Sequence, residues 1–349
     1  KAAEKSGLEP LIFCDKISKV FKDLTKKLNL SNDDFIRTTE KRHHLAVNDL
    51  WNKLVDSGDI YLSKYKGWYS ISDEAYYSSE EVLKKDGKNV AVPSGSVVEW
   101  VEEDSFFFKL SAWGDKLLKF YEKNNKFILP ISRRNEVVNF VKGGLNDLSV
   151  SRTSFTWGIK VPGNEKHVIY VWLDALTNYL SALNYPKITK LYKDFWPASV
   201  HVIGKDILRF HAIYWPAFLL AAKIDPPSRV FSHGWILSGD EKMSKSKGNI
   251  LDPIEIIKKY GADELRYYLM KEVSHGSDGS ISLQNLENCI NSDLANNFGN
   301  LCQRVFSFVK TNCNNEINSS SKLIISDKKL IKDTKNITDR LRDLMNDQN

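Results

Sequence analysis

The sequence predicts an α/β fold built on a doubly wound parallel sheet, followed by a region that contains helices only. Between residues 131 and 235, apolar strand-like runs alternate with segments of helical periodicity, a pattern typical of parallel sheets. The run Val168-Ile169-Tyr170-Val171 is continuously apolar, as expected of a strand that is buried on both faces. From about Asn285 onward, apolar residues recur only at helical spacing.

The size and composition of the chain are those of a soluble globular protein. Its 349 residues suggest two or three domains, and 27% charged and 42% hydrophobic residues are ordinary values. The net charge of +6 permits nucleotide or nucleic-acid partners without requiring them. The longest nearly apolar run, Ala212–Ala222, is shorter than the about 20 residues that span a bilayer, which argues against a membrane partner.

The first 130 residues mix helices with strands and turns. Periodicity predicts helices over Leu11–Leu28 and from about Lys41 to Val55, with a strand at Phe35–Thr39 between them. Asp59–Tyr69 shows β-type alternation, and Gly67 marks a hairpin-like break. The remaining signals are turns at Asp86-Gly87 and Pro93-Ser94-Gly95, and a helix from about Ser111 to Tyr121.

The later elements follow in order along the chain. The alternating region predicts strand His167–Trp172, helix Leu173–Leu183, strand Ser199–Ile203, helix Asp206–Ala222 and strand Arg229–Phe231. Asp252 is a good N-cap, and Pro253 suits the first turn of a helix that ends at Tyr260-Gly261. Another helix covers Ala262–Lys271, and the polar stretch 311–329 is predicted to be a loop.

A lysine-rich loop lies between the sheet region and the capped helix. Ser238–Asn249 contains Lys242-Met243-Ser244-Lys245-Ser246, with three lysines in six residues and a glycine on each side. Such a loop can be an ordinary solvated surface segment, but it can also hold a polyanion. Its place after an apolar strand and before a capped helix favours phosphate binding.

A second group of residues spans the predicted strand–helix junction. Trp172, Ala175, Leu176 and Tyr179 are spaced at i, i+3, i+4 and i+7, so they share one face if the helix starts at the strand end. Core packing is one interpretation of this face. The other is a slot at the small Ala175 between two aromatic rings, which suits a thioether because sulfur packs well against ring edges.

A third group begins where another strand ends. Gly204 lies at the carboxyl end of a predicted strand, the place where α/β sheets bind ligands. Backbone N–H groups at the following helix start could hold an anion or sugar oxygen, and Asp206 could accept hydrogen bonds from ribose hydroxyls. Ile207 and His211 face the same way on that helix, where His211 is either structural or functional.

The next strand ends at His233-Gly234-Trp235. Gly234 would let a flat base approach the backbone, or the three residues simply form a strand-ending turn with a packed tryptophan.

Taken together, these residues resemble one family. Lys242–Ser246 resembles the KMSKS signature of class I aminoacyl-tRNA synthetases, and Tyr170–Tyr179 and Gly204–Phe218 resemble methionyl-tRNA synthetases in particular. The similarity extends to segments Phe35–Thr39, Ser132–Val137 and Asn291–Asn296. It covers most of the chain up to about residue 310.

The resemblance implies a Rossmann-like nucleotide-binding domain that is split by a connective insertion and followed by an anticodon-binding helix bundle. The expected divisions are the rest of the first half of the nucleotide-binding domain (1–58), the insertion (59–150), the second half (151–237), the KMSKS loop with a stem-contact segment (238–284), and the start of the bundle (285–349).

The resemblance also implies a function: ATP-dependent activation of methionine to methionyl-adenylate and its transfer to tRNA(Met), in the cytoplasm, with Mg²⁺ on the ATP phosphates. Lys245 would meet the phosphates with Lys242 assisting, and Arg152 matches a basic position close to the active site. Gly204, Asp206, His233 and Trp235 would lie near the ribose and adenine. The methionine side chain would be lined by Trp172, Ala175, Leu176, Tyr179, Ile207 and His211.

Two departures from the family are visible. Its HIGH signature lies in an N-terminal segment, and none of the seven histidines here forms an H-x-G-H pattern, so this chain is expected to be inactive alone. Many relatives carry C-x-x-C pairs in the insertion, whereas this sequence has Ser70 and Asp73 at the ligand spacing and no C-x-x-C pair at all. Serine is a poor zinc ligand, so no structural zinc is predicted.

Three other interpretations stay open. One is a class I synthetase for another amino acid, such as a branched aliphatic one or cysteine. Another is a small-molecule nucleotidyltransferase, which the helices after Asn285 argue against because such an enzyme needs no tRNA-reading bundle. The third is a tRNA-binding fragment without catalysis.

Overall fold

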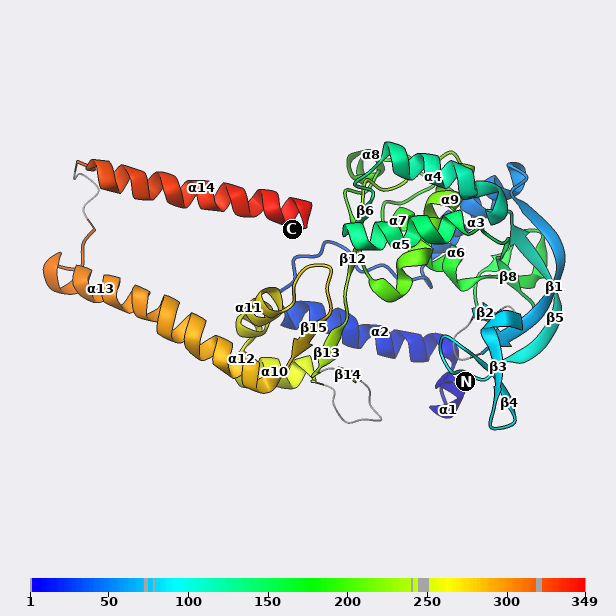
Figure 1. Ribbon diagram of the computed structural model, residues 1–349, viewed down its shortest axis with the longest axis horizontal. Coiled ribbons are helices and arrows are strands. Elements are labelled where there is room, and N and C mark those ends of the chain that lie inside the picture. The colour runs from blue at the N-terminus through cyan, green and yellow to red at the C-terminus, as the bar shows by residue number, and fades with distance from the viewer. Residues whose placement is uncertain are drawn as a thin grey trace. The chain divides into compact units, whose positions relative to one another are not determined.

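The computed structural model describes residues 2–71, 75–77, 79–239, 241–243, 251–317 and 322–348 (Figure 1). The chain forms two compact units, of which unit 1 comprises residues 1–17 and 33–232 and unit 2 comprises residues 18–32 and 233–349. Over these described ranges, no helix is both long enough and apolar enough to cross a membrane.

The long helices near the N-terminus follow the predicted periodicity. The helix predicted over Leu11–Leu28 is α2 (Pro10–Lys27), and the one predicted from Lys41 is α3 (Lys41–Asp56). A short helix, α1 (Ala2–Lys5), precedes them. In α3 the apolar face is buried, because Val47, Leu50 and Leu54 are fully enclosed in the core of unit 1.

The strand predicted at Phe35–Thr39 is wrong. The described segment has no strand there, and Thr38 and Thr39 lie in a turn. The backbone N–H of Phe35 donates to the Asp34 carboxylate, and that of Arg37 donates to Glu40 Oε1 at 3.2 Å. Local carboxylates therefore take the hydrogen bonds that a neighbouring strand would have needed.

A long antiparallel pair dominates the first part of unit 1. Strands β1 (Ile60–Ser70) and β5 (Glu99–Phe108) pair along ten positions, in a sheet of order β2-β1-β5-β7 (Figure 1). The outer strands are β2 (Ala75–Tyr77) and β7 (Leu148–Ser149). The break predicted at Gly67 is wrong, because Gly67 pairs with Val101 in the middle of β1. The extended ladder outweighs the weak strand preference of glycine.

The turn predicted at Asp86-Gly87 is confirmed. It joins β3 (Val82–Lys85) to β4 (Lys88–Ala91), and Asp86 and Gly87 both have positive φ. A two-residue hairpin of this kind needs positive φ at both positions, which aspartate tolerates and glycine adopts readily. The turn predicted at Pro93-Ser94-Gly95 is also present, because residues 92–94 form a turn.

The sheet expected of the alternating region is present but small. It has the order β11-β12-β6, with β6 (Ile128–Leu129), β11 (His201–Gly204) and β12 (Val230–His233), and β6 and β12 are parallel. Helix α4 (Gly114–Lys123) precedes β6, and the helices between the strands include α5 (Ile131–Lys142), α8 (Lys190–Phe195) and α9 (Trp215–Ala221). Two of the 3-10 helices, Ser79–Glu81 and Leu110–Trp113, precede α4 in the chain.

The strand predicted over His167–Trp172 is partly wrong. Strand β10 (Asn164–Ile169) ends three residues earlier and lies in a separate antiparallel sheet, between β8 (Ser151–Arg152) and β9 (Lys160–Val161). Val171 already begins a helix. The apolar run reads as one buried strand, yet only its first half pairs.

The helices that follow are more irregular than predicted. The helix predicted over Leu173–Leu183 is two helices, α6 (Val171–Leu176) and α7 (Asn178–Ser181), which are separated at Thr177. The helix predicted over Asp206–Ala222 consists of a 3-10 turn at Lys205–Ile207, a π-helical turn at Phe210–Tyr214 and then α9.

Unit 2 contains a small sheet and several helices, two of which lie between β14 and β15 in the chain. The sheet has the order β14-β13-β15, with β13 (Ile236–Ser238), β14 (Glu241–Lys242) and β15 (Gly279–Ile281). The helices are α10 (Pro253–Tyr260), α11 (Ala262–Glu272), α12 (Leu283–Cys289), a π-helical stretch at Ile290–Gly299, α13 (Asn300–Asn312) and α14 (Ile325–Asp347). The described residues from 283 onward thus confirm the predicted all-helical region, although the predicted loop 311–329 is shortened at both ends.

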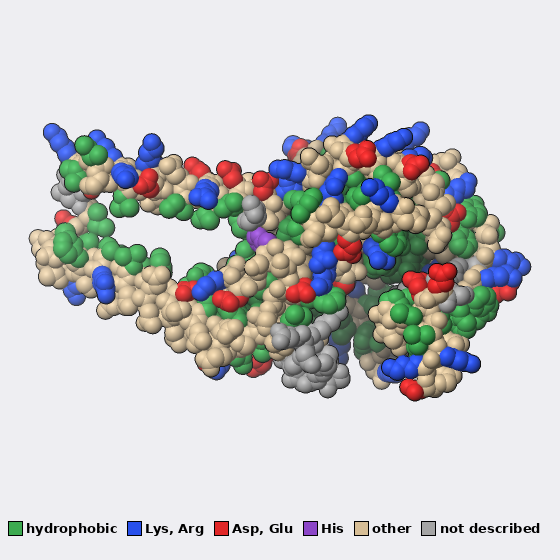
Figure 2. Space-filling view, viewed as in Figure 1, with side chains coloured by type: hydrophobic (Ala, Val, Ile, Leu, Met, Phe, Trp, Pro, Cys, Tyr) green, Lys and Arg blue, Asp and Glu red, His purple; other side chains and the backbone are tan. Residues whose placement is uncertain are grey.

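Helices α13 and α14 keep apolar side chains on their surface, visible as green stripes in Figure 2. Phe306 is 67% exposed and Leu330 is 69% exposed. The core of unit 2 is formed instead by residues of α10, α11, β15 and α12, such as Ile256, Leu265 and Leu286.

We predict that Asp252→Ala lowers the free energy of unfolding of unit 2 by about 1 kcal/mol. The Asp252 carboxylate accepts a hydrogen bond from Ile254 N at 2.8 Å and thereby caps α10. Amide hydrogen exchange should become faster at the start of α10. The matched control is Asp263→Ala, since Asp263 is exposed in the first turn of α11, which has no side-chain cap. Equal effects of the two substitutions would contradict the capping role.

Candidate functional site

A chain of hydrogen bonds in unit 1 links three of the residues that were predicted to line a side-chain pocket. The Tyr179 hydroxyl lies 2.8 Å from His211 Nε2, and His211 Nδ1 lies 3.0 Å from the Ile207 carbonyl oxygen. A carbonyl oxygen can only accept, so Nδ1 carries the proton and Nε2 accepts from the Tyr179 O–H. The arrangement selects one neutral tautomer of His211 and holds the Tyr179 ring in place.

The π-helical turn brings a further aromatic ring beside this chain. Trp172 on α6 stacks on Phe210, with ring centroids 3.6 Å apart and planes 11° from parallel. Ala175 is half-buried on α6, whereas Leu176 is 1% exposed and belongs to the hydrophobic core. Because α6 ends at Leu176, Tyr179 lies on α7 and not on the same continuous helix face as predicted.

Two large residues of this cluster were missed from the sequence. His201 stacks on Tyr179 with centroids 3.8 Å apart, and the Trp215 ring lies 6.3 Å from Tyr179. His201 and Ile203 are buried in β11 while Val202 between them is exposed, so alternation along this strand was the signal that could have identified His201. The cluster is therefore aromatic, largely buried and contains two imidazole rings.

Burial keeps both histidines of the cluster uncharged. Desolvation lowers the pKa of His201 to about 3, with a smaller effect from His211 nearby. It also lowers the pKa of His211, against the opposing hydrogen bond to Ile207. Burial of the Tyr179 hydroxyl raises its pKa to about 12. At neutral pH the whole cluster is electrically neutral.

The residues predicted to contact the nucleotide lie in both units. Gly204 ends β11, and Asp206 is exposed in the 3-10 turn that follows, which confirms the predicted strand end. His233 and Trp235 belong to unit 2. His233 is exposed, with Nδ1 2.8 Å from the Gly234 carbonyl oxygen, and Trp235 N donates to Asp278 Oδ1 at 2.8 Å.

The sequence offered two explanations for Gly234, and the one in which glycine makes room for a flat base is wrong. A Cβ at Gly234 would lie 2.1 Å from the Ser277 carbonyl oxygen and 2.4 Å from Asp278 N. The chain's own backbone therefore occupies the space that glycine provides, and the alternative of a strand-ending turn is the better one.

The predicted phosphate-binding lysines are only partly visible. The backbone of Lys242 pairs with Leu237 between β14 and β13, but its side chain and the whole of Lys245 lie outside the described residues. Their predicted role therefore stays a prediction.

Arg152 lies inside unit 1, where it is 1% exposed. Its Nη1 donates to Ser149 Oγ at 2.8 Å and to the Ser151 carbonyl oxygen at 2.6 Å. Its guanidinium carbon lies 4.4 Å from the centre of the Tyr170 ring. These contacts make Arg152 part of a buried polar network, in contrast to the open position that phosphate contact would suggest.

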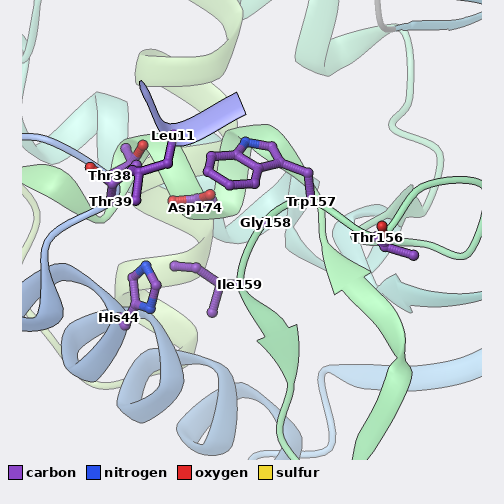
Figure 3. Close-up of a pocket in the computed structure, with 9 residues that line it drawn as sticks. All are labelled: Leu11, Thr38, Thr39, His44, Thr156, Trp157, Gly158, Ile159 and Asp174. Atoms are coloured by element: carbon purple, nitrogen blue, oxygen red, sulfur yellow. The ribbon is translucent and has the colours of Figure 1, made fainter. Parts of the chain in front are cut away.

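Unit 1 also contains a pocket of about 290 Å³ that was not anticipated (Figure 3). Figure 3 shows the Asp174 carboxylate between the Thr38 and Thr39 side chains and the Trp157 indole. Four separate segments line it, contributing Leu11, Thr38, Thr39, His44, Thr156, Trp157, Gly158, Ile159 and Asp174. No local sequence pattern marks such a pocket.

The Asp174 carboxylate forms a hydrogen bond with a buried histidine, His43. His43 Nε2 lies 2.6 Å from Asp174 Oδ1, and His43 Nδ1 lies 2.9 Å from Ser181 Oγ. His43 is completely buried, so α3 is tied to α6 and α7 by polar contacts within the core.

Metal-ligand groups are not gathered at any described position. Within the described ranges, no three His, Cys, Asp or Glu side chains could jointly hold a metal ion. Cys14, Cys289 and Cys302 lie on α2, α12 and α13, Cys313 directly follows α13, and all four are free thiols.

Comparison with known proteins assigns the chain to a family. Residues 1–306 match the family described as tRNA synthetases class I (M). The methionine–tRNA ligase of Rickettsia typhi is 56% identical over 312 residues, which is 89% of this chain and 61% of that protein. The methionine–tRNA ligase of Brucella suis is 50% identical over 349 residues, which is 100% of this chain and 68% of that protein.

A solved structure is similar over nearly the whole chain. Mycobacterium tuberculosis methionyl-tRNA synthetase bound by methionyl-adenylate superposes with a TM-score of 0.95 at 45% identity, covering 99% of this chain and 68% of that one. The chain thus spans about three fifths to two thirds of the length of these relatives.

We predict that unit 1 loses stability as the pH falls below about 6.5. Both histidines have folded-state pKa values below the ordinary one, so the unfolded chain binds more protons in that range. For His201 the loss continues down to about pH 3, at up to roughly 1.4 kcal/mol per pH unit. Urea unfolding at a series of pH values, monitored by tryptophan fluorescence, measures this loss of stability. The signal reports on unit 1 because eight of the nine tryptophans, all except Trp235, lie there.

His201→Phe should flatten this acid dependence. The control is His275→Phe, at an exposed histidine of unit 2, which should leave it unchanged. An acid limb with the same slope in wild type and His201→Phe would disprove the assignment.

Proposed function

We propose that this chain, which belongs to the class I tRNA synthetases (M), carries most of the site at which the complete protein activates methionine with ATP and transfers it to tRNA(Met). One observation carries the proposal. The buried Tyr179–His211–Ile207 chain and the Trp172–Phe210 stack occur in a sequence whose similarity to methionine–tRNA ligases extends over its whole length.

The physical character of the cluster suits the methionine side chain. A thioether is polarizable, uncharged and only a weak hydrogen-bond acceptor, so a neutral aromatic pocket suits it better than a charged one. Trp172, Tyr179 and His211 would supply the rings, with Ile207, Ala175 and Leu176 completing the walls. Leu176 would act from the core side, because it is almost fully buried.

ATP would bind at the strand end next to this pocket. Gly204 and Asp206 follow β11, where exposed Asp206 could accept hydrogen bonds from ribose hydroxyls. By the resemblance, His233 and Trp235 would lie near the adenosine, and Lys242 and Lys245 near the phosphates. Arg152 would act indirectly, by fixing β8 through its contacts with Ser149 and Ser151.

The chemistry needs charge stabilisation more than proton transfer. The methionine carboxylate attacks the α-phosphorus of ATP, which forms methionyl-adenylate and releases pyrophosphate. This carboxylate is already ionised at neutral pH, so no general base is needed in the first step. A terminal ribose hydroxyl of tRNA then takes the methionyl group and releases AMP. Lysines that reach the phosphates mainly in the transition state would lower the barrier of the first step.

Mg²⁺ would arrive with the ATP phosphates. Mg²⁺ is commonly bound by one or two carboxylates together with substrate phosphates, and no three-residue protein cage is found among the described positions. We also propose that the insertion needs no zinc, since Ser70, at the spacing that the resemblance implies for a zinc ligand, is a poor ligand and is buried in β1.

The domain plan is proposed from the family. Residues 1–58 and 151–237 would form the nucleotide-binding domain around a connective insertion (59–150), with 238–284 as the stem-contact segment. The exposed apolar stripes of α13 and α14 support the proposal that 285–349 begins a larger anticodon-binding bundle, because such helices are stable when their stripes are covered. The cytoplasm remains the expected location.

We predict that Lys245→Ala in the full-length protein lowers the rate of adenylate formation by roughly 10²–10³, because a transition-state charge contact is lost. Methionine-dependent pyrophosphate exchange measures this rate. Lys247→Ala removes the same charge from the same loop and should have a much smaller effect. Wild-type exchange by Lys245→Ala would remove Lys245 from the mechanism.

We predict that Tyr179→Phe raises the methionine KM about five- to tenfold and leaves the ATP KM within twofold. The substitution deletes the hydroxyl that donates to His211 Nε2 and leaves that buried nitrogen without a partner. Tyr192→Phe, at a half-buried tyrosine near Trp196, is the control. An unchanged methionine KM would place the pocket elsewhere, and a panel of amino acids in the same assay would reveal a different substrate.

A further inference from the structure

The pocket of about 290 Å³ in unit 1 brings an aromatic ring next to a carboxylate and hydroxyl groups. Figure 3 shows the Trp157 indole on one side of the Asp174 carboxylate and the Thr38 and Thr39 side chains on the other. The volume lies near the lower end of the about 300–1,000 Å³ found for small-molecule sites, which suits one nucleoside and no longer segment. Proteins bind unpaired bases in this way, by stacking on an aromatic ring and hydrogen bonds to the base edge.

The Asp174 carboxylate has one oxygen committed to the protein and one left for the pocket. His43 Nε2 donates to Asp174 Oδ1 at 2.6 Å, because an ionised carboxylate can only accept. His43 is completely buried, and its Nδ1 lies 2.9 Å from Ser181 Oγ, so the imidazole is held at both nitrogen atoms. The Asp174 side chain keeps 17% of its surface exposed, and its Oδ2 takes no part in these contacts. It can therefore accept from a donor in the pocket.

The Trp157 indole is exposed, but the loop that carries it is anchored. Trp157 is 47% exposed. Gly158 follows with a φ of +131°, and a Cβ there would lie 2.5 Å from Val168 Cγ1, so only glycine lets the loop approach β10 this closely. The Ile159 carbonyl oxygen then accepts from Ile169 N, also in β10, at 2.8 Å. An exposed ring on an anchored loop is a ready surface on which a base can stack.

The pocket borders the same short helix as the candidate methionine site. Asp174 lies on α6 two residues after Trp172, which stacks on Phe210. Successive residues of an α-helix are turned by about 100°, so these two side chains leave α6 on nearly opposite sides. An α-helix with its side chains is about 10–12 Å wide. A nucleoside in the pocket would thus lie within about one helix width of the group to be transferred.

We propose that this pocket receives the terminal adenosine of tRNA, with the adenine stacked on Trp157 and its amino group donating to Asp174 Oδ2. This inference rests on the function proposed above, in which a ribose hydroxyl at the tRNA end takes the methionyl group. Adenine offers a donor at N6 and an acceptor at N7, which match the carboxylate and the hydroxyls of Thr38 and Thr39. Guanine would instead turn its O6 acceptor toward the carboxylate.

The first experiment separates the two steps of the reaction in the full-length protein. Methionine-dependent pyrophosphate exchange measures adenylate formation without tRNA, and aminoacylation of a tRNA(Met) transcript measures both steps. For Trp157→Ala we expect kcat/KM for tRNA to fall roughly ten- to a hundredfold, because the stacking surface is lost, while exchange changes less than twofold. The control is Phe155→Ala, at a 42% exposed aromatic residue of the same loop that does not line the pocket. It should change neither assay.

A second experiment tests the contact with the amino group. Terminal inosine carries a carbonyl oxygen in place of the amino group of adenosine. The unaltered protein should aminoacylate an inosine-ended tRNA(Met) about tenfold less well, since two acceptors would face each other. In Asp174→Asn the side-chain oxygen still accepts from His43, and the amide can donate to the new carbonyl oxygen. The adenosine-to-inosine ratio of kcat/KM should therefore fall at least threefold.

Three results would overturn the inference. One is aminoacylation at the unaltered rate by Trp157→Ala, and another is the same adenosine-to-inosine ratio in the unaltered protein and in Asp174→Asn. The third is an equal fall of exchange and aminoacylation in both variants, which would mean that the pocket serves packing or ATP binding instead. If the unaltered protein fails to activate methionine at all, the proposed function itself is wrong, and that outcome is visible before any variant is made.

Discussion

The candidate site depends on a hydrogen-bond chain that is kept neutral by burial. His211 can accept from Tyr179 only while its Nε2 is unprotonated, and its Nδ1 proton is committed to the Ile207 carbonyl. Desolvation opposes the imidazolium, so the surrounding aromatic rings maintain the protonation state that the geometry requires. Protonation of His211 would reverse its hydrogen bond with Tyr179, because Nε2–H would then donate to the hydroxyl oxygen, and it would place a charge among buried aromatic rings.

The irregular helices of unit 1 decide where the Tyr179 and Phe210 rings lie. A continuous helix from Val171 would place Tyr179 on one face with Trp172, but the break at Thr177 turns α7 so that Tyr179 meets His201 and His211 instead. The π-helical turn at Phe210–Tyr214 places Phe210 against Trp172. Single π-helical turns occur often at functional sites, where the extra residue changes the direction of side chains.

Buried polar groups connect elements that are distant in the sequence. His43 joins α3 to Asp174 on α6, and Arg152 joins β8 to β7 and to the Tyr170 ring. Burial of such groups is costly unless every hydrogen bond is formed, so these contacts select one arrangement of the elements more strongly than apolar packing does. The ring nitrogens of His201 and Trp215, by contrast, have no hydrogen-bond partner among the described residues.

The sequence by itself determined the features that depend on near neighbours in the chain. The helix periods of α2 and α3, the cap at Asp252 and the hairpin at Asp86-Gly87 all follow from residues a few positions apart. The proposal of Tyr179, Ile207 and His211 as site residues also came from the sequence, because their neighbouring residues resemble a known family. Only the tertiary structure decided that Gly67 continues a strand, that Phe35–Thr39 is not one, and that Gly234 makes room for Ser277. It also brought His201 to Tyr179 and Asp174 to Thr38, since contacts across tens to more than a hundred residues depend on desolvation and pairing partners that no local pattern specifies.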